Sequence, residues 1–234
     1  MNRVIFEDLG TINYKDAWDY QEKVFNETVQ IKIQNREADK PKQEVQHHLL
    51  LCEHTPVITL GKNANASNVL LSKSVLQQKH IDLFPINRGG DVTFHGPGQI
   101  VGYPILDLDA FYTDIGKYLR DIEEVIIRTI AEYGISGERL KGVTGVWLDA
   151  ENPFKARKIC AIGIRCSRWV TMHGFAFNVN TDLSYFDTII PCGLSDKKVT
   201  SLQQELGEII DMEIVKKKVM HHFEDVFQCN LYTI

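Results

Sequence analysis

The chain has 234 residues, of which 44% are hydrophobic, and its 26 Lys and Arg against 31 Asp and Glu leave a net charge of −5. A chain of this size can bury roughly 70% of its surface, so it needs no disulfide or metal to support a core. The acidic balance argues against a dedicated nucleic-acid-binding protein, because no strongly basic surface is available to displace counterions from phosphates. We therefore expect a globular protein with no nucleic-acid partner.

The N-terminus and the apolar runs argue against export and membrane insertion. Glu7 and Asp8 stand where a signal peptide would carry apolar residues. The longest apolar runs are far shorter than the ~20 residues that a membrane-spanning helix requires. These features predict a soluble, cytoplasmic protein with no membrane association.

In chain order, the periodicity of apolar residues predicts a helix over 15–34, strands over 47–52 and 55–61, and a short helix over 72–80. Strands follow over 83–87, 91–94 and 99–106, then a helix over 113–133, which ends at Gly134. Further strands are predicted over 145–149, 158–165 and 174–178, and helices over 201–206 and 212–227. Helices thus flank a block of strands that do not alternate regularly with them. This order predicts an α/β (α+β-like) fold with a mixed sheet flanked by helices, and one domain over 1–234, because no break in composition is visible.

A glycine-rich segment, RGGDVTFHGPGQ, covers residues 88–99. Its four glycines allow the main chain to approach a ligand closely, although no Lys-Ser/Thr follows them as in a phosphate-binding Walker loop. In an extended chain Asp91, Thr93 and His95 share one face. Two readings remain open for this segment: two tight turns around an ordinary strand, or a loop that lines a substrate site.

Small residues mark two of the later strands, in Ala161-Ile162-Gly163 and Gly174-Phe175-Ala176. Strands of this kind can pass beside an apolar chain without filling its space. His173 precedes the second triplet, and for this residue alone a hydrogen-bonded, half-buried histidine is the ordinary interpretation.

The five cysteines lie at positions 52, 160, 166, 192 and 229, without a Cys-x-x-Cys pair. This spacing predicts neither a disulfide framework nor a metal site. Cys52 and Cys160 lie in apolar runs, as packing residues do, whereas Cys166 lies in a polar stretch and Cys229 has no informative neighbours. We expect a reducing compartment and no bound metal.

Cys192 differs from the others because it lies between Pro191 and Gly193, in a turn. A nucleophile is presented in this way, and the glycine could offer main-chain N–H groups to an oxyanion. A thiol with a pKa of ~8.5 needs a nearby cation or base to react at neutral pH. Lys158, His173 and His95 are the available groups, and the pattern of residues does not choose between them.

Three segments together resemble a known family. RGGDVTFHGPGQIVGYPILDL, GVTGVWLD with KICAIGIRCSRWVTMHGFAFNVNTDL, and FDTIIPCGL resemble the lipoyl(octanoyl) transferases, in order and at similar spacing over residues 88–194. The resemblance implies the fold of the biotin/lipoate protein ligase catalytic domain. It also implies transfer of an octanoyl group from octanoyl-acyl carrier protein to a specific lysine of a lipoyl domain or of the glycine-cleavage H protein, in a monomer, with no cofactor.

The resemblance also carries residue roles. Cys192 matches the nucleophile that holds the acyl group as a thioester, and Lys158, chosen over the nearby Lys155 and Arg157, matches the lysine that lowers the thiol's pKa and shuttles protons. His173 is a candidate supporting residue. The residues that match substrate-binding stretches are Arg88, Gly89, Gly90, Asp91, Val92, Thr93, Phe94, His95, Ala161, Ile162, Gly163, Gly174, Phe175 and Ala176.

Three alternatives remain. The nearest is an ATP-dependent lipoate or biotin ligase of the same fold, which would activate a free acid and would not need Cys192. The others are a non-catalytic module that binds an acylated carrier and a Cys-His hydrolase. Acyl carrier proteins and lipoyl domains are typically acidic, so docking calls for a locally basic rim, for which the candidates are Arg165, Arg168, Lys197 and Lys198.

Overall fold

The computed structural model describes residues 1–37, 41–190 and 198–233. Its helices are α1 (Tyr14–Gln34), α2 (Lys73–Gln78), α3 (Ile115–Ala131), α4 (Leu202–Leu206) and α5 (Met212–Phe227). Its strands are β1 (Asn2–Ile12), β2 (His47–His54), β3 (Val57–Leu60), β4 (Asp82–Pro85), β5 (Val92–His95), β6 (Gln99–Ile105), β7 (Glu138–Leu140), β8 (Val143–Leu148), β9 (Arg157–Ser167), β10 (Val170–Asn178), β11 (Lys198–Val199) and β12 (Cys229–Tyr232).

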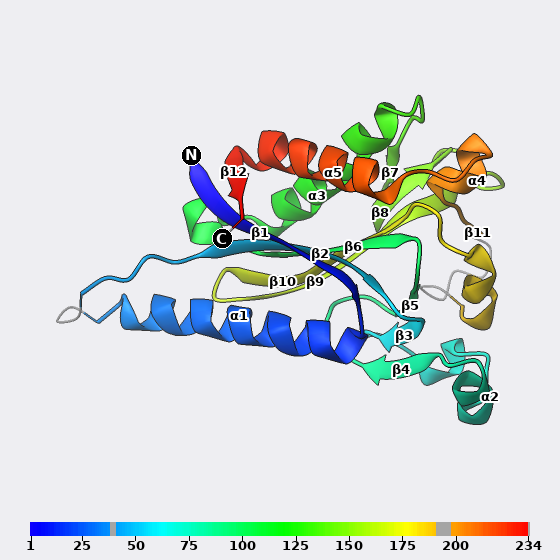
Figure 1. The fold of residues 1–234 in the computed structure, drawn as a ribbon, viewed down its shortest axis with the longest axis horizontal. Coiled ribbons are helices and arrows are strands. Elements are labelled where there is room, and N and C mark those ends of the chain that lie inside the picture. Colours follow the sequence, from blue (N-terminus) through cyan, green and yellow to red (C-terminus); the bar gives the residue numbers. More distant parts are fainter. Residues whose placement is uncertain (38–40, 191–197, 234) are drawn as a thin grey trace.

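Within the described residues, nine strands form one large mixed sheet in the order β12-β1-β2-β6-β10-β9-β8-β7, with β11 added alongside β9 (Figure 1). β1 runs parallel to both β2 and β12, and β11 runs parallel to β9. The pairs from β2 through β6, β10, β9 and β8 to β7 are antiparallel. The expected mixed sheet flanked by helices is confirmed.

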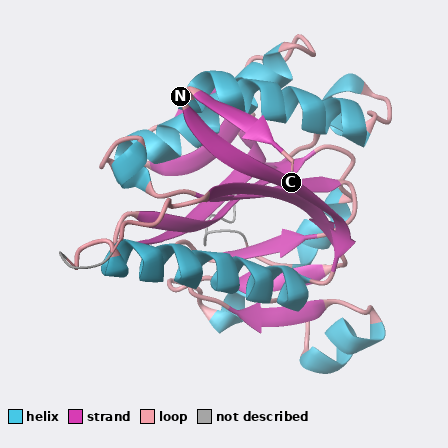
Figure 2. Cartoon of the chain, turned by 60° about the vertical axis from the view of Figure 1, so that its left-hand side comes forward, coloured by secondary structure: helices cyan, strands magenta, loops and turns pink. Residues whose placement is uncertain are grey.

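Helices cover both faces of this sheet (Figure 2). α3 and α5 pack on one face, where Tyr118, Ile122 and Ile126 of α3 are fully buried in the larger core. α1 lies on the opposite face with Ala17, Val24 and Phe25 in a second core. Each of these helices buries a stripe at spacings of three and four residues, which is why the sequence pattern predicted them.

A second, three-stranded sheet has the order β4-β3-β5 and lies on the same side of the large sheet as α1 (Figure 1). It has its own small core, in which the Phe94 ring stacks on Tyr185 with the ring centroids 4.6 Å apart. Because successive residues of a strand face opposite ways, burying Phe94 there turns Thr93 and His95 toward the large sheet. The small sheet therefore supplies one wall of the space described below.

The pattern of apolar residues did not predict β1, β7 or β12. β1 buries the consecutive residues Val4 and Ile5, so it lacks clean alternation. Its partners lie far away along the chain, with Val4 opposite both His47 and Leu231. Pairing between distant segments, not local pattern, defines this edge of the sheet.

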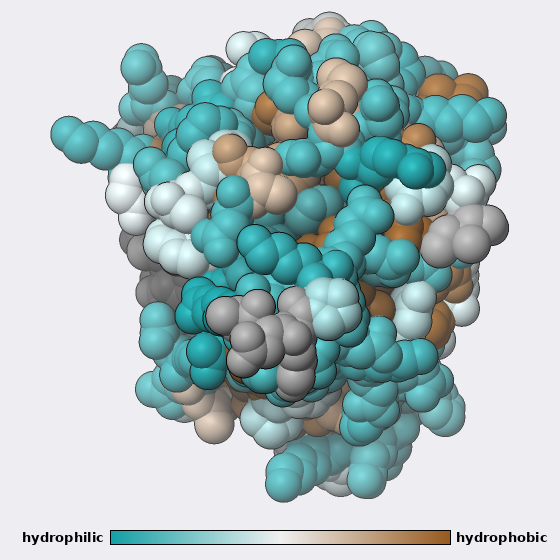
Figure 3. Space-filling model, turned by 90° about the vertical axis from the view of Figure 1, so that its left-hand side faces the viewer, coloured by the Kyte–Doolittle hydropathy of each residue, from teal (hydrophilic) through white to brown (hydrophobic). Residues whose placement is uncertain are grey.

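No helix in the described part of the chain combines the length and the apolar character that crossing a membrane would take. The face shown in Figure 3 is mostly hydrophilic, with hydrophobic atoms visible mainly in recesses between polar side chains.

Candidate functional site

A cavity of about 370 Å³ lies between the small sheet, with the loop before β5, and the face of the large sheet formed by β6, β9 and β10. It gathers residues that are far apart in the chain, from Tyr14 of α1 to Val199 of β11. The residues predicted from the sequence that line it are Arg88, Gly89, Gly90, Asp91, Val92, Thr93, His95, Lys158, Ala161, Ile162, Gly163, His173, Gly174, Phe175 and Ala176. Phe94 is not among the lining residues, because its side chain packs into the small core.

Small residues form much of the cavity floor. Ala161 lies opposite Ala176, and Gly163 lies opposite Gly174, in the antiparallel pair of β9 and β10. Paired residues share one face of the sheet, so these four positions form a patch with almost no side-chain bulk. The sequence predicted that these strands leave space for an apolar chain beside them, and the cavity lies over this patch.

The central residues of the two triplets face the other way. The side chains of Ile162 and Phe175 pack in or against the core under α3 and α5. They therefore border the cavity through their main chain, as the alternation of a strand requires. Substitutions at these two positions would act on the core more than on a ligand.

The glycine-rich loop rests directly on β9. Gly89 donates its N–H to the carbonyl of Ile164 at 2.9 Å. A Cβ on Gly163 would lie 2.8 Å from the Gly89 carbonyl oxygen, and one on Gly61 would lie 2.3 Å from that of Gly90. Side chains at these positions would force the loop off the sheet, so the glycines permit the close approach that forms the cavity wall.

Arg88 braces this loop against β3. Its Nη2 donates to the carbonyl oxygen and to the Oγ1 of Thr59, at 3.1 and 3.0 Å, and its Nη1 donates to the Gly89 carbonyl at 3.0 Å. The side chain is 8% exposed. Its described contacts are therefore structural, and they place a positive charge in the cavity wall.

His95 belongs to a buried polar chain at the end of β5. Its Nδ1–H donates to Gln99 Oε1 at 2.8 Å, since the Nε2 of Gln99 is engaged in donating to Asn178 Oδ1, also at 2.8 Å. Asn178 in turn donates to the Thr200 carbonyl at 3.0 Å. Burial lowers the pKa of His95 to about 3, with the positive charge of Arg88 adding to the effect. His95 is therefore neutral at physiological pH.

His173 is also held neutral. Burial lowers its pKa to about 3, and the charges of Arg88 and Arg165 act in the same direction. Its Nε2 is 2.7 Å from Asn87 Oδ1, and Asn87 donates to Glu22 at 3.0 Å. The expectation of a hydrogen-bonded histidine is confirmed, although the residue is 2% exposed and thus fully buried.

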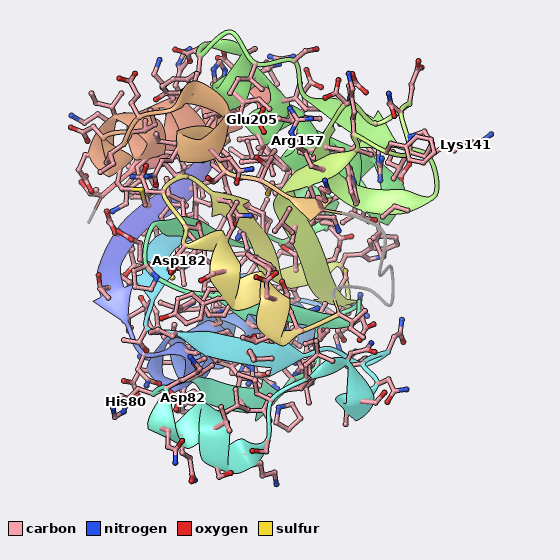
Figure 4. The ribbon with its side chains drawn as sticks, turned by 90° about the vertical axis from the view of Figure 1, so that its right-hand side faces the viewer. His80, Asp82, Lys141, Arg157, Asp182 and Glu205 are labelled. Atoms are coloured by element: carbon pink, nitrogen blue, oxygen red, sulfur yellow. The ribbon has the colours of Figure 1, made fainter. Side chains whose placement is uncertain are left out.

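Lys158 reaches the cavity, whereas Lys155 does not. Lys158 lines the cavity, with its Nζ 4.7 Å from the ring centroid of Trp147. Lys155 lies exposed in the turn between β8 and β9. Arg157 turns away from the cavity and pairs with Asp149 and Glu205, and Figure 4 shows Arg157 beside Glu205. Among these three cations of one short segment, the geometry singles out Lys158.

Cys192 lies outside the described residues, but the chain on both sides of it is anchored. Before it, Ile190 donates its N–H to the Asn68 carbonyl at 2.8 Å. After it, β11 pairs with the start of β9, so that Val199 lies opposite Lys158. The segment that carries Cys192 therefore ends in a strand that is hydrogen-bonded to the segment that carries Lys158.

The four described cysteines are free thiols. Cys52 and Cys160 are fully buried in the two main cores, so their interpretation as packing residues is confirmed. Cys229 is likewise buried, and Cys166 is partly exposed. Burial raises the pKa of each of the four, to about 12 for Cys229. All four are thus protonated near neutral pH and are poor nucleophiles.

The structure describes three of the four residues that were expected to form a basic rim, Arg165, Arg168 and Lys198. Arg165 pairs with Glu22 at 3.0 Å, and Arg168 follows the far end of β9, ten residues from Lys158 or about 30 Å along a strand. Lys197 lies outside the described residues. Lys198 is exposed and begins β11, next to the strand that carries Lys158.

Several lining residues were not predicted: Tyr14, Gln99, Val101, Tyr103 and Asn178. Gln99, Val101 and Tyr103 occupy alternate positions of β6, so they share one face of this predicted strand. The sequence did not indicate which of its two faces bordered a cavity. Tyr14 lies in the first turn of α1, and nothing in the sequence around it indicated a place in the site.

Comparison with known proteins identifies the family. The model of the lipoyl protein ligase A/B catalytic domain matches residues 13–224. A protein of Christiangramia forsetii named octanoyltransferase is 55% identical over 233 residues, covering 99% of each chain. One of the same name from Flavobacterium psychrophilum is 56% identical over 233 residues, covering 99% of this chain and 100% of the relative.

Solved structures share the fold at low identity. A bi-partite lipoate protein ligase from Thermoplasma acidophilum superposes with a TM-score of 0.70 at 14% identity, covering 100% of this chain and 86% of that one. A lipoate-protein ligase A bound with ATP gives a TM-score of 0.69 at 13% identity, covering 100% and 88%. At such identities the likeness concerns the fold alone. From the family match over most of the chain and the relatives of above 50% identity, this chain belongs to the lipoyl protein ligase A/B catalytic domain family.

Proposed function

We propose that this chain transfers an octanoyl group from octanoyl-acyl carrier protein to a specific lysine of lipoyl-domain proteins, including the glycine-cleavage H protein, through a thioester on Cys192. The relatives named octanoyltransferase, similar over nearly their whole length, support this activity. The observation that carries it in the structure is Lys158 at a cavity whose floor is built from paired small residues.

The first step exchanges one thioester for another. Lys158 takes the proton of the Cys192 thiol, and the thiolate attacks the carbonyl carbon of the octanoyl thioester. The bond between the carbonyl carbon and the carrier's sulfur breaks, and the departing carrier thiol receives the proton from Lys158. The exchange is nearly isoenergetic because the bond formed and the bond broken are of the same kind.

The second step forms an amide. The acceptor's lysine amine attacks the acyl-Cys192 carbonyl, the bond to sulfur breaks, and Lys158 passes the amine's proton to the departing Cys192 thiolate. Conversion of a thioester to an amide is downhill, so the reaction needs no ATP and no cofactor. This energetic difference separates the proposal from an ATP-dependent ligase of the same fold.

The cavity supplies the binding energy for the acyl chain. The octanoyl group has seven carbons beyond its carbonyl, and at about 0.8 kcal/mol for each buried CH₂ its full burial contributes roughly 5 kcal/mol. The patch of Ala161, Gly163, Gly174 and Ala176 offers the space for it. The neutral state of His95 and His173 avoids placing further charge beside an apolar chain.

The test is intact-mass spectrometry of the protein after incubation with octanoyl-acyl carrier protein, without ATP. We expect one octanoyl adduct, which a lipoyl domain discharges onto its lysine. Cys192→Ala should form no adduct and transfer nothing, whereas Cys166→Ala, which removes another thiol that is partly exposed, should behave as the wild type.

Each alternative has its own outcome in this experiment. Transfer that requires ATP and free octanoic acid, and persists in Cys192→Ala, would identify a ligase. Release of free octanoate without transfer would identify a hydrolase, and binding of the acylated carrier without any acyl movement would identify a binding module.

A further inference from the structure

An irregularity in the pairing of β8 with β9 determines where Lys158 points. Val146 lies opposite Cys160, but the next residue, Trp147, lies opposite Lys158. One step along β8 therefore corresponds to two steps along β9, which leaves Ile159 as the extra residue of a β-bulge.

The bulge reverses the direction of the Lys158 side chain. Ile159 and Cys160 are neighbours in sequence, yet both are fully buried in the core under α3 and α5. Lys158 and Ala161, on either side of this pair, line the cavity on the other face. Under regular alternation Lys158 would share the face of Cys160, so without the bulge its ammonium group would point into the apolar core.

The main chain of Gly145 lies directly beside the Lys158 side chain. A Cβ at this position would lie 3.4 Å from the Lys158 Cε and 2.7 Å from the Cys160 carbonyl oxygen. Its φ of +126° is also a backbone conformation that residues other than glycine rarely adopt. The location of the Gly145 main chain therefore limits where the Lys158 side chain can lie.

A buried carboxylate holds that main chain. Glu123 of α3 is 0% exposed, and its Oε1 accepts the N–H of Gly145 at 2.9 Å. Its Oε2 accepts from Arg139 Nε at 3.1 Å and forms an ion pair with Arg120 Nη1 at 2.8 Å. One oxygen thus faces the bulged segment while the other is held by two guanidinium groups.

We propose that Glu123 is a positioning residue for Lys158: through Gly145 it holds the bulged part of β8 and β9 in the geometry that directs the lysine into the cavity. The proposal rests on the role of Lys158 given under Proposed function. A buried ionised carboxylate is costly, and Glu123 meets that cost with two arginines on one side and a single main-chain N–H on the other. That N–H belongs to Gly145, which lies beside the Lys158 side chain, as Trp147 does.

The test is a double-mutant cycle on the rate of acyl transfer from octanoyl-acyl carrier protein to Cys192 in a single turnover. Glu123→Met, which has a similar length but lacks both carboxylate oxygens, is made in the wild type and in Lys158→Ala. We expect it to slow the wild type about tenfold or more, as small misplacements of reacting groups do. In Lys158→Ala the same change should alter the rate less than about twofold, because no lysine remains to be positioned.

The matched control is Arg139→Gln, which removes a partner of the other Glu123 oxygen and leaves the Gly145 hydrogen bond in place. It should lower the stability to urea with little change in rate. If Glu123→Met does not fold, Glu123→Asp, which keeps the charge for the arginines but shortens the reach to Gly145, takes its place in the same cycle.

Two results overturn the proposal: a folded Glu123 variant with the wild-type rate, or an equal loss of rate in both backgrounds. A different result concerns the proposed function itself. If Lys158→Ala alone retains the wild-type rate, the role of the lysine is wrong, whatever the Glu123 variants do.

Discussion

The N–H of Thr200 donates a hydrogen bond to the main-chain carbonyl of Lys158 at 2.9 Å. Thr200 follows the segment that carries Cys192, and its Oγ1 donates to Glu205, which also pairs with Arg157. Thr200 is therefore tied to Lys158 directly and to the adjacent Arg157 through Glu205. This relationship connects the proposed nucleophile's segment with the proposed proton carrier across 34 residues of sequence, from 158 to 192.

Removal of the Lys158 amine should slow both half-reactions. Lys158→Ala takes away the group that lines the cavity, and general acid–base catalysis of this kind contributes about 10² to 10⁴ in rate. Lys155→Ala is the control, since Lys155 is exposed and does not line the cavity. Rapid-quench measurement of acyl-enzyme formation and of its discharge tests both steps; an equal loss in the two variants would contradict the assignment.

Filling the cavity floor should shorten the acyl chain that the protein accepts. Ala176→Val adds two methyl groups opposite Ala161, where the paired strands have least bulk. We expect the ratio of rates with hexanoyl and octanoyl carriers to shift toward hexanoyl by about 10-fold, the effect of one to two methylenes in an apolar pocket. Ile122→Val, a core change beneath the opposite face of the sheet, should lower stability and leave this ratio unchanged.

Buried histidines should make the fold less stable in mild acid. The pKa values of His54, His95 and His173 are lowered to about 4, 3 and 3, primarily by burial, against about 6.5 in an unfolded chain. Between these values the unfolded chain binds more protons than the folded one. Stability is therefore complete above the unfolded pKa and is lost as pH falls, by up to about 1.4 kcal/mol per pH unit for each histidine.

Urea unfolding from about pH 7 to pH 5 measures this slope. His95→Gln should reduce this slope by about the contribution of one proton, because burial lowers the pKa of His95 in the folded protein. A slope that does not change in His95→Gln would show that this histidine is protonated in the folded protein.

Lys32 should be a strong determinant of stability. Its ammonium group, 7% exposed, pairs with Asp107 and, at 2.8 Å, with Asp109, and it donates to the Arg168 carbonyl. Lys32→Ala would leave Asp107 buried without its cation, so we expect a loss of about 3–5 kcal/mol in the free energy of unfolding. Lys15→Ala, which breaks an exposed pair with Asp19, should cost less than about 1 kcal/mol by the same urea titration.

The helices were the part of the fold most readily predicted. α3 has Asp114 as its N-cap and buries a continuous stripe, so its start and its period are both local properties of the sequence. β1 and β12 were not predicted because what makes them strands is pairing with each other and with β2. Contacts between residues more than 200 positions apart leave no local pattern.

The residues of the site were likewise predicted where local sequence decides, and not where long-range packing decides. The residue types at 88–95, 158–163 and 173–176 predicted the lining of one site because the motifs are contiguous in the chain. The side chain of Phe94 packs in the small core, and those of Ile162 and Phe175 pack in or against the larger core. Their directions depend on which face of each strand other elements cover. Only the packing of the second sheet and of α3 and α5 decides that.

By itself, the sequence determined the class of protein, the mixed sheet with its flanking helices, the family and the residues able to react, because composition, periodicity and contiguous motifs are local properties. The tertiary structure decided that Lys158 and not Lys155 reaches the cavity. It did so through a one-residue bulge against β8 and a carboxylate from α3 beneath it. One extra residue in a pair of strands is enough to turn the next side chain to the other face of the sheet. Whether such a bulge forms depends on contacts between segments that are distant in the sequence. The acidic net charge argued against a dedicated nucleic-acid-binding protein, and the fold places Arg165, one of the basic residues suggested for a rim, in an ion pair with Glu22.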